Sequence, residues 1–397
     1  MTRPLRILRI ADVPRNPHGG MGKAMLGSGA PLEARGHQID YWFDGDLRAP
    51  GSPKLRRFTV PPTLVRRVRQ AQRAGRAYDV VEIHEPLAGA YTLARRLRSS
   101  SPAALPPCVV FSHGLEEGRH AAEIAYRQRV GLPVGAKRRF SPHTVIQQAK
   151  FAVRNAEHVM CCNHADRNHL IGAGVPAARL TAKPSGLDDA FLNLDETPLP
   201  DADQPAFLFL GSWVPRKGTR ELIDAGQRLL AENPTATLTL AGVGTAGPEA
   251  QNAFDPAVRP RVHILPEVRG DQALIDLYRR HTALVLPSFY EGQPLVMLEA
   301  AAAGRPVVTT GICGMLDFIE DQVHGLLVPP GDAHALGAAL SRLAQDRDLA
   351  TRMGRAGRDR AQEHGWQAVI HTVEHAYQAA MEVTTSMRVT ETSEIHA

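Results

Sequence analysis

The chain has 397 residues, of which 43% are hydrophobic and 22% charged, and its formal net charge is +5. A chain of this length exceeds what one hydrophobic core usually serves, so the sequence predicts a globular protein of two domains. The composition is ordinary for a globular protein, and the mild positive charge does not indicate a nucleic-acid partner.

The four cysteines, Cys108, Cys161, Cys162 and Cys313, form no C-x-x-C pair and no zinc-finger spacing with histidine. We interpret them as reduced thiols, which predicts a cytoplasmic protein. The amino-terminal stretch carries charges inside its apolar run, and no segment approaches the roughly 20 apolar residues that span a bilayer. We therefore expect neither a signal peptide nor a membrane-spanning helix.

Strands and helices alternate through residues 1–193, and this alternation predicts a parallel sheet. A proline-rich, acidic stretch at 194–205 is the predicted linker, and a second alternating series fills residues 206–365. A last helix is expected at 366–385, with a tail at 386–397. The predicted fold class is α/β, with two doubly wound, Rossmann-like domains.

The segment SFYEGQPLVMLEAAAAGRP places two carboxylates, Glu291 and Glu299, on either side of a predicted helix start. Pro294 suits the first helical position, and the free backbone N–H groups of Gln293–Val296 favour an anion there. A sugar nucleotide would fit, with its diphosphate on the helix start and its hydroxyl groups on the two carboxylates. The alternative is that Glu299 is an ordinary exposed helix residue.

Upstream, the stretch FLGSWVPRKG carries Lys217 in a loop before a helix, and a lysine suits a diphosphate. Together with E-x7-E, AAGRPVVTT and HGLLVPPGD, this ordered set resembles the retaining glycosyltransferases of family 4, the glycosyl transferases group 1. The resemblance implies a GT-B fold, in which an acceptor-side first domain and a donor-binding second domain face a cleft. It further implies that the helix at 366–385 crosses back to pack on the first domain. It also implies that Glu291 contacts the donor sugar, Glu299 the nucleotide ribose and Lys217 the diphosphate. The family usually has an arginine where this chain has Ser212, and Arg216 is the candidate replacement.

The first half of the chain offers weaker signals. In NPHGGMGK, Gly19, Gly20 and Gly22 let a backbone approach a ligand closely, although a plain tight turn is the alternative. His113 ends a predicted strand, and the resemblance implies that it faces the donor sugar; a histidine satisfied by loop backbone is the alternative. His84 and Glu85, at another strand end, are candidates for acceptor contact.

The predicted site therefore has two overlapping parts. The candidate catalytic residues are His113, Lys217 and Glu291. The candidate donor-binding residues are Gly19, Gly20, Ser212, Arg216, Lys217, Glu291, Gly292, Gln293, Pro294, Leu295, Val296 and Glu299.

Two D-x-D strings are candidates for a metal site. Asp44 and Asp46 lie in a predicted surface loop, and Asp201 and Asp203 lie in the predicted linker. No His or Cys cluster accompanies them, so we expect neither a metal nor another cofactor.

The predicted function is transfer of a sugar from a nucleoside-diphosphate sugar to an acceptor hydroxyl, with retention, in polysaccharide, glycolipid or other glycoconjugate synthesis. Positioning and electrostatics would supply the catalysis. The alternatives are a sugar-nucleotide epimerase of the same fold and a non-catalytic sugar-nucleotide-binding protein.

A basic segment runs from Lys54 to Arg76 without an acidic residue. Its eight basic residues are Lys54, Arg56, Arg57, Arg66, Arg67, Arg69, Arg73 and Arg76. An apolar stripe at helical spacing (Leu64, Val65, Val68 and Ala71) lies among them. This pattern predicts a weak contact with anionic membranes, on the inner face, and a carbohydrate or lipid-linked acceptor. The alternative is an ordinary surface helix whose stripe packs on the sheet.

Overall fold

The computed structural model describes residues 3–17, 20–47, 56–97, 104–135, 143–201 and 203–395. The chain forms two compact units. The first unit comprises Met1–Glu117, Gly135–Pro184 and Trp366–Ala397, and the second comprises Gly118–Val134 and Ser185–Gly365.

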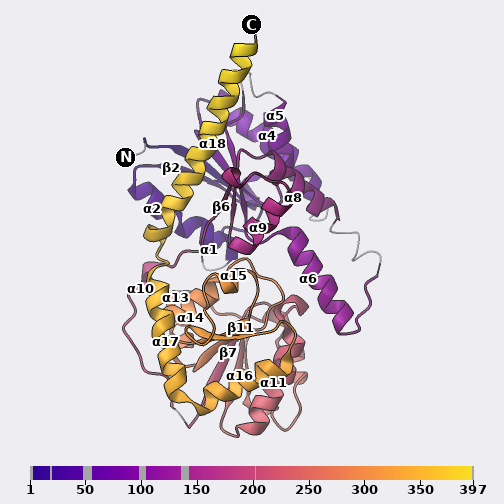
Figure 1. Ribbon diagram of the computed structural model, residues 1–397, viewed down its shortest axis with the longest axis vertical. Coiled ribbons are helices and arrows are strands. Elements are labelled where there is room, and N and C mark those ends of the chain that lie inside the picture. The colour runs from indigo at the N-terminus through magenta and orange to yellow at the C-terminus, as the bar shows by residue number, and fades with distance from the viewer. Residues whose placement is uncertain are drawn as a thin grey trace. The chain divides into compact units, whose positions relative to one another are not determined.

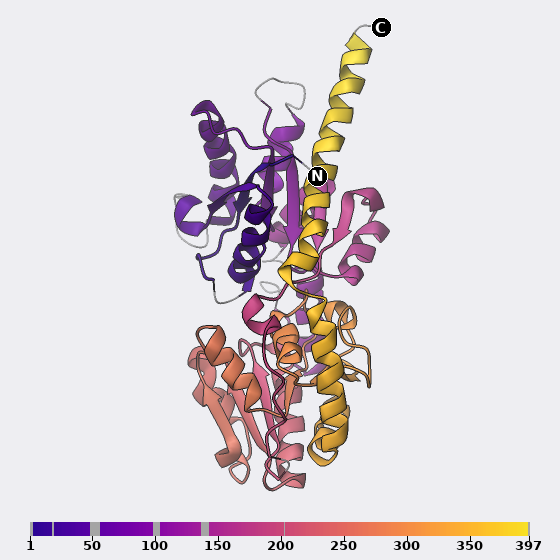
Figure 2. The same ribbon diagram turned by 90° about the vertical axis from the view of Figure 1, so that its left-hand side faces the viewer.

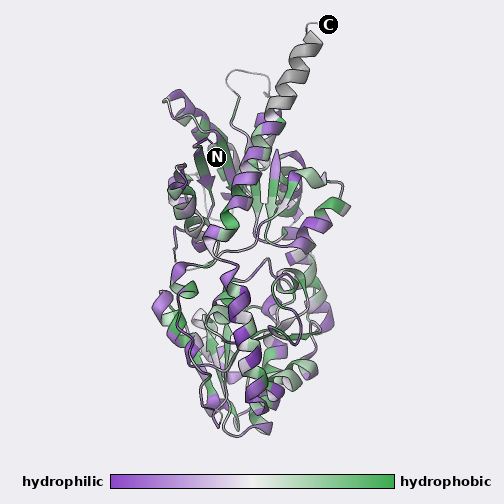
Figure 3. Cartoon of the chain, turned by 60° about the vertical axis from the view of Figure 1, so that its left-hand side comes forward, coloured by the Kyte–Doolittle hydropathy of each residue, from purple (hydrophilic) through white to green (hydrophobic). Residues whose placement is uncertain are grey.

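The first unit is built on a six-stranded parallel sheet in the order β2-β1-β3-β4-β5-β6 (Figure 1). Its strands are β1 (Arg6–Ile10), β2 (Gln38–Trp42), β3 (Val80–His84), β4 (Cys108–Ser112), β5 (His158–Cys161) and β6 (Leu180–Ala182). Its helices are α1 (Gly20–Gly27), α2 (Gly29–Ala34), α3 (Asp44–Leu47), α4 (Arg56–Arg73), α5 (Gly89–Arg96), α8 (His143–Asn155), α9 (His164–Gly172) and α18 (Trp366–Ile395). The central strands β3 and β4 are buried along their whole length, as expected for a parallel sheet that is covered on both faces (Figure 3).

Different helices cover the two faces of this sheet. On one face, the apolar residues of α4, including Leu64 and Val68, pack in the same core as Val81 and Val110 of the strands. The packing of α4 therefore agrees with the alternative that the basic segment is a surface helix whose apolar stripe packs on the sheet. On the other face, α18 lies along the strands and buries Ile370 and Val373 against them (Figure 2).

The second unit contains a six-stranded parallel sheet in the order β12-β11-β10-β7-β8-β9. Its strands are β7 (Ala206–Leu210), β8 (Thr237–Ala241), β9 (Val262–Leu265), β10 (Ala283–Leu286), β11 (Val307–Thr310) and β12 (Gly325–Val328). Its helices are α10 (Asp189–Leu192), α11 (Thr219–Glu232), α12 (Gly247–Asn252), α13 (Asp271–Arg279), α14 (Leu295–Ala302), α15 (Cys313–Leu316), α16 (Ala333–Gln345) and α17 (Arg347–Gln362). Helix α6 (Glu116–Arg129) begins at the end of the first unit and continues in the second.

The strand orders locate the positions where ligands bind in open α/β sheets. In each sheet the winding direction reverses once, between β1 and β3 in the first unit and between β7 and β10 in the second. Ligands bind at the carboxyl ends of strands beside such a reversal. The loops that carry Lys217 and Glu291 follow β7 and β10, the two strands at the reversal in the second unit.

The compact units differ from the predicted domain limits in three places. Residues 118–134 join the second unit, where the ring of Tyr126 packs edge-on against Phe289 at a centroid distance of 5.0 Å. The predicted linker 194–205 also packs on the second unit, because Leu199 is in its core and Arg305 donates to Pro198 O at 3.1 Å. The last helix continues to Ile395, past the predicted limit at 385.

Candidate functional site

A cationic loop follows β7 in the second unit. It holds the exposed Ser212 and a short 3-10 turn, Pro215–Lys217, that presents Arg216 and Lys217. Gly218 is the capping residue directly before α11 and has a φ of 71°, a conformation that glycine adopts without strain. This left-handed residue directs the chain from the cationic turn into the helix, and so fixes where Lys217 stands.

The loop after β10 brings Glu291 to these two cations. One carboxylate oxygen, Oε1, lies 2.5 Å from Lys217 Nζ and 3.1 Å from Arg216 Nη1. Ser288 Oγ also donates to Oε1, at 3.0 Å. The structure therefore unites three predicted site residues from two loops. Two cations against one carboxylate leave a net positive charge for an anionic ligand.

Glu299 is not an exposed helix residue. Its side chain is only 3% exposed, and its Oε2 accepts a 2.9 Å hydrogen bond from the hydroxyl of Tyr278 on α13. The alternative of an ordinary exposed glutamate is therefore wrong. A buried carboxylate needs partners, and Tyr278 links α14 to the helix that follows β9.

The start of α14 differs by one residue from the prediction. Pro294 is extended (ψ 121°) and caps the helix, and Leu295 is the first helical residue, followed by Val296. Gln293 is buried, and its side chain accepts from the backbone N–H of Ser185. Gly292 lies against Gly314, where a Cβ would overlap with the Gly292 carbonyl oxygen. These contacts fix the loop that leads into the helix.

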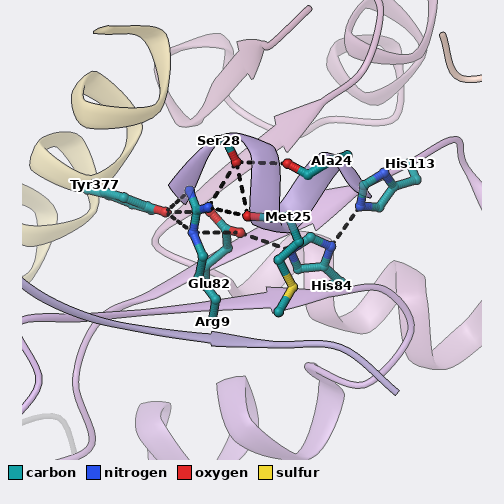
Figure 4. Close-up of polar contacts among 8 residues, drawn as sticks. All are labelled: Arg9, Ala24, Met25, Ser28, Glu82, His84, His113 and Tyr377. Carbon is teal, nitrogen blue, oxygen red and sulfur yellow. Dashed lines mark hydrogen bonds and ion pairs between the residues drawn. The ribbon is translucent and has the colours of Figure 1, made fainter. Parts of the chain in front are cut away.

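The first unit buries a polar chain that ends at His113 (Figure 4). His113 Nε2 lies 2.7 Å from His84 Nδ1, and His84 Nε2 lies 2.8 Å from Glu82 Oε1. Tyr377 on α18 donates to Glu82 Oε2 at 2.6 Å. Because the partner of His113 is the side chain of His84 on β3, the alternative of a histidine satisfied by loop backbone does not hold for His113.

The side chain of Arg9, on β1, contacts this polar chain at Tyr377 and Glu82. Its guanidinium donates to the Tyr377 hydroxyl at 2.9 Å and to Met25 O and Ser28 Oγ at 2.8 and 2.9 Å. It also pairs with Glu82 at 3.4 Å. Burial alone would raise the pKa of Glu82, but the Arg9 charge and the hydrogen bond from His84 lower it below its ordinary value. Glu82 is therefore an ionised carboxylate inside the protein.

The glycine-rich loop after β1 is described in part. Gly19 lies outside the described residues, and Gly20 is the first residue of α1, with a φ of 55°. Gly22 packs so closely on Asn16 that a Cβ would overlap with the Asn16 carbonyl oxygen. Gly22 therefore serves a tight local turn, whereas no atom of the described residues lies within 4 Å of a Cβ placed on Gly20.

Glu85 lies apart from His84, on the other side of the strand end. It lines a cavity of about 220 Å³ in the first unit, together with residues of α8 and α9 such as Lys150 and His169. Its Oε2 is buried without a hydrogen-bond partner among the described residues. Burial raises the pKa of Glu85 to about 8, so the group is mainly a neutral acid at pH 7.

The D-x-D aspartates serve local turns. Asp46 accepts from Phe43 N at 2.9 Å, and Asp44 and Asp201 accept from backbone N–H groups one and two residues further on. Among the residues that the structure describes, no cluster of three or more His, Cys, Asp or Glu side chains could hold a metal ion. In the same described part, no helix is long and apolar enough to cross a bilayer.

Sequence reasoning missed several residues of these two sites. No sequence pattern connected Arg9 and Glu82 with Tyr377, because Arg9 and Tyr377 are 368 positions apart in the chain. Tyr278 lies on a helix, α13, and no motif marks it as a site residue. Charged residues inside otherwise apolar strands, as in RILRI and VVEIH, were the one available sign of a buried network.

Two parallel Rossmann-like sheets with a cationic loop and a helix start at the reversal of the second sheet define the GT-B class of glycosyltransferase folds. Residues 204–346 match the family model "Glycosyl transferases group 1", and residues 19–186 match "Glycosyl transferase 4-like domain". The chain belongs to the group 1 glycosyltransferases, family 4.

Individual relatives agree with this assignment. The chain is 31% identical to the glycogen synthase of Mycobacterium tuberculosis over 281 residues, 69% of this chain and 63% of that protein. The chain thus spans less than two thirds of that relative. It is also 32% identical to the D-inositol 3-phosphate glycosyltransferase of Streptomyces griseus, over 44% of this chain and 39% of that one.

Solved structures share the fold. Sucrose-phosphate synthase from Thermosynechococcus elongatus matches with a TM-score of 0.74 and 22% identity, over 94% of this chain and 98% of that one. Anabaena HepE in complex with UDP and glucose matches with a TM-score of 0.66 and 19% identity, over 96% and 100%.

Proposed function

We propose that the protein is a retaining glycosyltransferase that moves a sugar from a nucleoside-diphosphate sugar to an acceptor hydroxyl. The observation that carries this proposal is the junction of Arg216, Lys217 and Glu291 beside the start of α14. The diphosphate would lie on the free N–H groups of Leu295 and its neighbours, because the start of a helix attracts anions. Lys217 and Arg216 would stabilise the negative charge that develops on the leaving diphosphate.

Glu299 is the proposed partner of the nucleotide ribose. Its link to Tyr278 places it beside α13, which follows β9. A pocket at the ends of β7, β8 and β9, lined by Leu210, Gly242, Pro266 and Val268 among others, is the proposed place for the base. Apolar and backbone surfaces of this kind accept a flat ring.

The proposed mechanism assigns no covalent nucleophile to the protein. Glu291, which is held by two cations and Ser288, would accept hydrogen bonds from donor-sugar hydroxyls. We propose that His113, in addition to Glu291, contacts the donor sugar. The cationic loop would replace a metal ion, so we propose a metal-independent reaction.

The two rival functions make different predictions in one assay. The protein is incubated with UDP-glucose, ADP-glucose and GDP-mannose, with and without simple sugars and a membrane lipid extract as acceptors. A transferase releases nucleoside diphosphate faster when an acceptor is present. An epimerase ignores the acceptor, and a pure binding protein gains thermal stability from the donor without turnover. Activity that is lost in EDTA and restored by Mg²⁺ would contradict metal independence.

Two substitutions test the assigned donor contacts. We expect Lys217→Ala and Glu299→Gln each to lower kcat/KM at least tenfold, because each removes a charge-assisted contact worth roughly 1.5–3 kcal/mol. Arg228→Ala is the control, since Arg228 pairs with Glu232 on the exposed side of α11. Folded variants with wild-type kinetics would remove Lys217 and Glu299 from the site.

A lipid-linked acceptor is the finer part of the proposal. On the outer side of α4, Phe58 and Arg66 are exposed at helical spacing, and an apolar groove lined by Phe58, Pro62, Leu93 and Phe151 lies beside them. Arginines around exposed aromatic and aliphatic side chains favour an anionic bilayer surface. This arrangement supports peripheral contact with such a membrane, although the apolar stripe of α4 is used by the core.

Liposome binding tests this contact. We expect co-sedimentation with vesicles of phosphatidylglycerol and phosphatidylcholine at low salt, and loss of binding at high salt or on replacing Arg66, Arg69 and Arg73 with Gln. Vesicles of phosphatidylcholine alone are the control. Absence of binding at low salt would favour a soluble acceptor.

A further inference from the structure

The hydrogen bonds of the polar chain in the first unit determine which of its atoms carry protons (Figure 4). Glu82, His84 and Tyr377 are all buried, so each donor must meet an acceptor inside the protein. The ionised carboxylate of Glu82 can only accept hydrogen bonds. Since Glu82 Oε1 lies 2.8 Å from His84 Nε2, this nitrogen of His84 carries a proton.

The second nitrogen of His84 follows from its charge state. Burial lowers the pKa of His84 below its ordinary value, despite the hydrogen bond to Glu82, so the ring is neutral at pH 7. A neutral imidazole with a proton on Nε2 has a lone pair on Nδ1. His84 Nδ1 lies 2.7 Å from His113 Nε2, so His113 Nε2 must be the donor.

The same reasoning determines which ring nitrogen of His113 is protonated. Burial, together with neighbouring His84 and Lys183, lowers the pKa of His113 well below 6.5. The neutral ring holds its one proton on Nε2, in the bond to His84. Nδ1 of His113 is then left unprotonated.

We propose that Glu82 and His84 are positioning residues that hold His113 as its Nε2–H tautomer, so that His113 Nδ1 accepts a hydrogen bond from a sugar hydroxyl. The identity of the ligand rests on the proposed function, whereas the tautomer does not. In this state His113 recognises a hydroxyl donor and cannot protonate a leaving group. Tyr377 and Arg9 hold the Glu82 carboxylate in place, so α18 contributes to the orientation of His113.

Nitrogen-15 NMR of the ligand-free protein, labelled at histidine, tests the tautomer directly. Two-bond proton–nitrogen correlations at pH 7 should show His84 and His113 with the proton on Nε2. His281 is an internal control of the opposite kind, because its Nδ1 lies 2.6 Å from Leu277 O and its Nε2 lies 2.8 Å from Thr239 Oγ1. Single His→Gln variants assign the signals. A His113 that is protonated on Nδ1 or doubly protonated would overturn the proposal.

The Glu82→Gln variant tests whether the Glu82 carboxylate determines the tautomers of His84 and His113. An amide can donate to His84 as well as accept from it, so His84 and His113 should become tautomeric mixtures while His281 is unchanged. Glu157→Gln is the matched control, since Glu157 is a buried carboxylate of the same unit that pairs with Arg95 at 2.6 Å. His84→Phe, which removes the acceptor for His113, should give the same mixture if Glu82→Gln does not fold. A pure Nε2–H tautomer of His113 in either variant would show that the chain does not position it.

Kinetics with the folded variant separate this proposal from the proposed function. If His113 Nδ1 accepts from the donor, Glu82→Gln should lower kcat/KM for the donor about tenfold, and Glu157→Gln should not. A tautomeric change in Glu82→Gln with unchanged kinetics would support the positioning chain and overturn the sugar contact.

Discussion

Lys183 of the first unit is a cation buried between two aromatic rings. Its Nζ lies 4.9 Å from the ring centroid of Phe111 and 5.0 Å from that of Trp366, and its side chain is only 2% exposed. Burial lowers the pKa of Lys183 from 10.5 to about 8. The cation–π contacts therefore offset only part of the cost of removing the charge from water.

We expect Lys183→Met to stabilise the protein by about 3 kcal/mol at pH 7, since each pKa unit corresponds to about 1.4 kcal/mol. Between pH 8 and 10.5 the unfolded chain binds more protons at this position, so the wild-type penalty is full below pH 8 and fades as the pH rises. The gain should shrink to about 1 kcal/mol at pH 9.5. Urea unfolding at both pH values measures it, with Lys150→Met, at an ion-paired and more exposed lysine, as the control. An equal gain in stability at both pH values would contradict the lowered pKa of Lys183.

At the scale of residues, the sequence was sufficient to bring Lys217 and Glu291 together, because both residues lie near strand ends. Lys217 and Glu291 each follow an apolar strand closely, and adjacent strands bring such loops together. Glu299 could be placed on a helix, but its burial depends on Tyr278, which no local pattern connects to it. The network of Arg9, Glu82 and Tyr377 depends on packing between the two ends of the chain, which periodicity does not report.

The turn between β7 and α11 is the element on which the cationic loop depends. Gly218 has a φ of 71°, and a Cβ there would overlap with the carbonyl oxygen of Pro287, the residue after β10. The close approach of these two loops therefore requires glycine. Gly270 precedes α13 with a φ of 83°, but no atom of the part of the chain that the structure describes lies within 4 Å of its Cβ position.

Substituting alanine for Gly218 and for Gly270 distinguishes the cost of a positive φ from the cost of steric overlap. Both variants should lose about 1 kcal/mol from the positive φ, whereas Gly218→Ala should lose roughly 1–3 kcal/mol more and displace Lys217. We expect transfer activity to fall at least tenfold in Gly218→Ala only. Chemical unfolding and donor kinetics measure the two effects. Equal stabilities would mean that the loops can separate at little cost.

Two helices, α6 and α17, have apolar patterns too weak to predict from the sequence. Helix α17 buries mostly small residues (Gly354, Gly357 and Ala361, beside Leu349 and Met353), and its glycines resemble helix breakers in a sequence. Gly354 in fact allows close packing on Gly304 O. Helix α6 has few apolar residues because it is largely half-buried. The strands β4, β7 and β10 were predictable because each is a short apolar run.

At the scale of the whole molecule, the first unit is discontinuous in sequence. Its sheet is made before residue 184, but one face is covered by α18, from the far end of the chain. We expect Ile370→Ala, at a fully buried site of α18, to cost about 2–5 kcal/mol in the first unit alone. Hydrogen exchange should accelerate in β1, β3, β4 and β5 and stay slow in β7–β12.

Leu340→Ala is the reciprocal control, since Leu340 of α16 is fully buried in the core of the second unit. It should accelerate exchange in β7–β12 and leave the first sheet protected. Acceleration throughout both units in either variant would mean that the two cores unfold as one cooperative body.

The late position of α18 has a consequence for biosynthesis. A ribosome that adds roughly 5–20 residues per second finishes the first sheet about 10–40 seconds before it has made α18. Throughout that interval Val109 and Met160 lack their cover and Glu82 lacks Tyr377, and the second unit has its whole sequence once residue 365 is made, before α18 begins. The later half of the polypeptide can thus mature before the earlier half. The nascent first sheet, apolar on its open face, is then the stage at which a chaperone would protect the chain from aggregation.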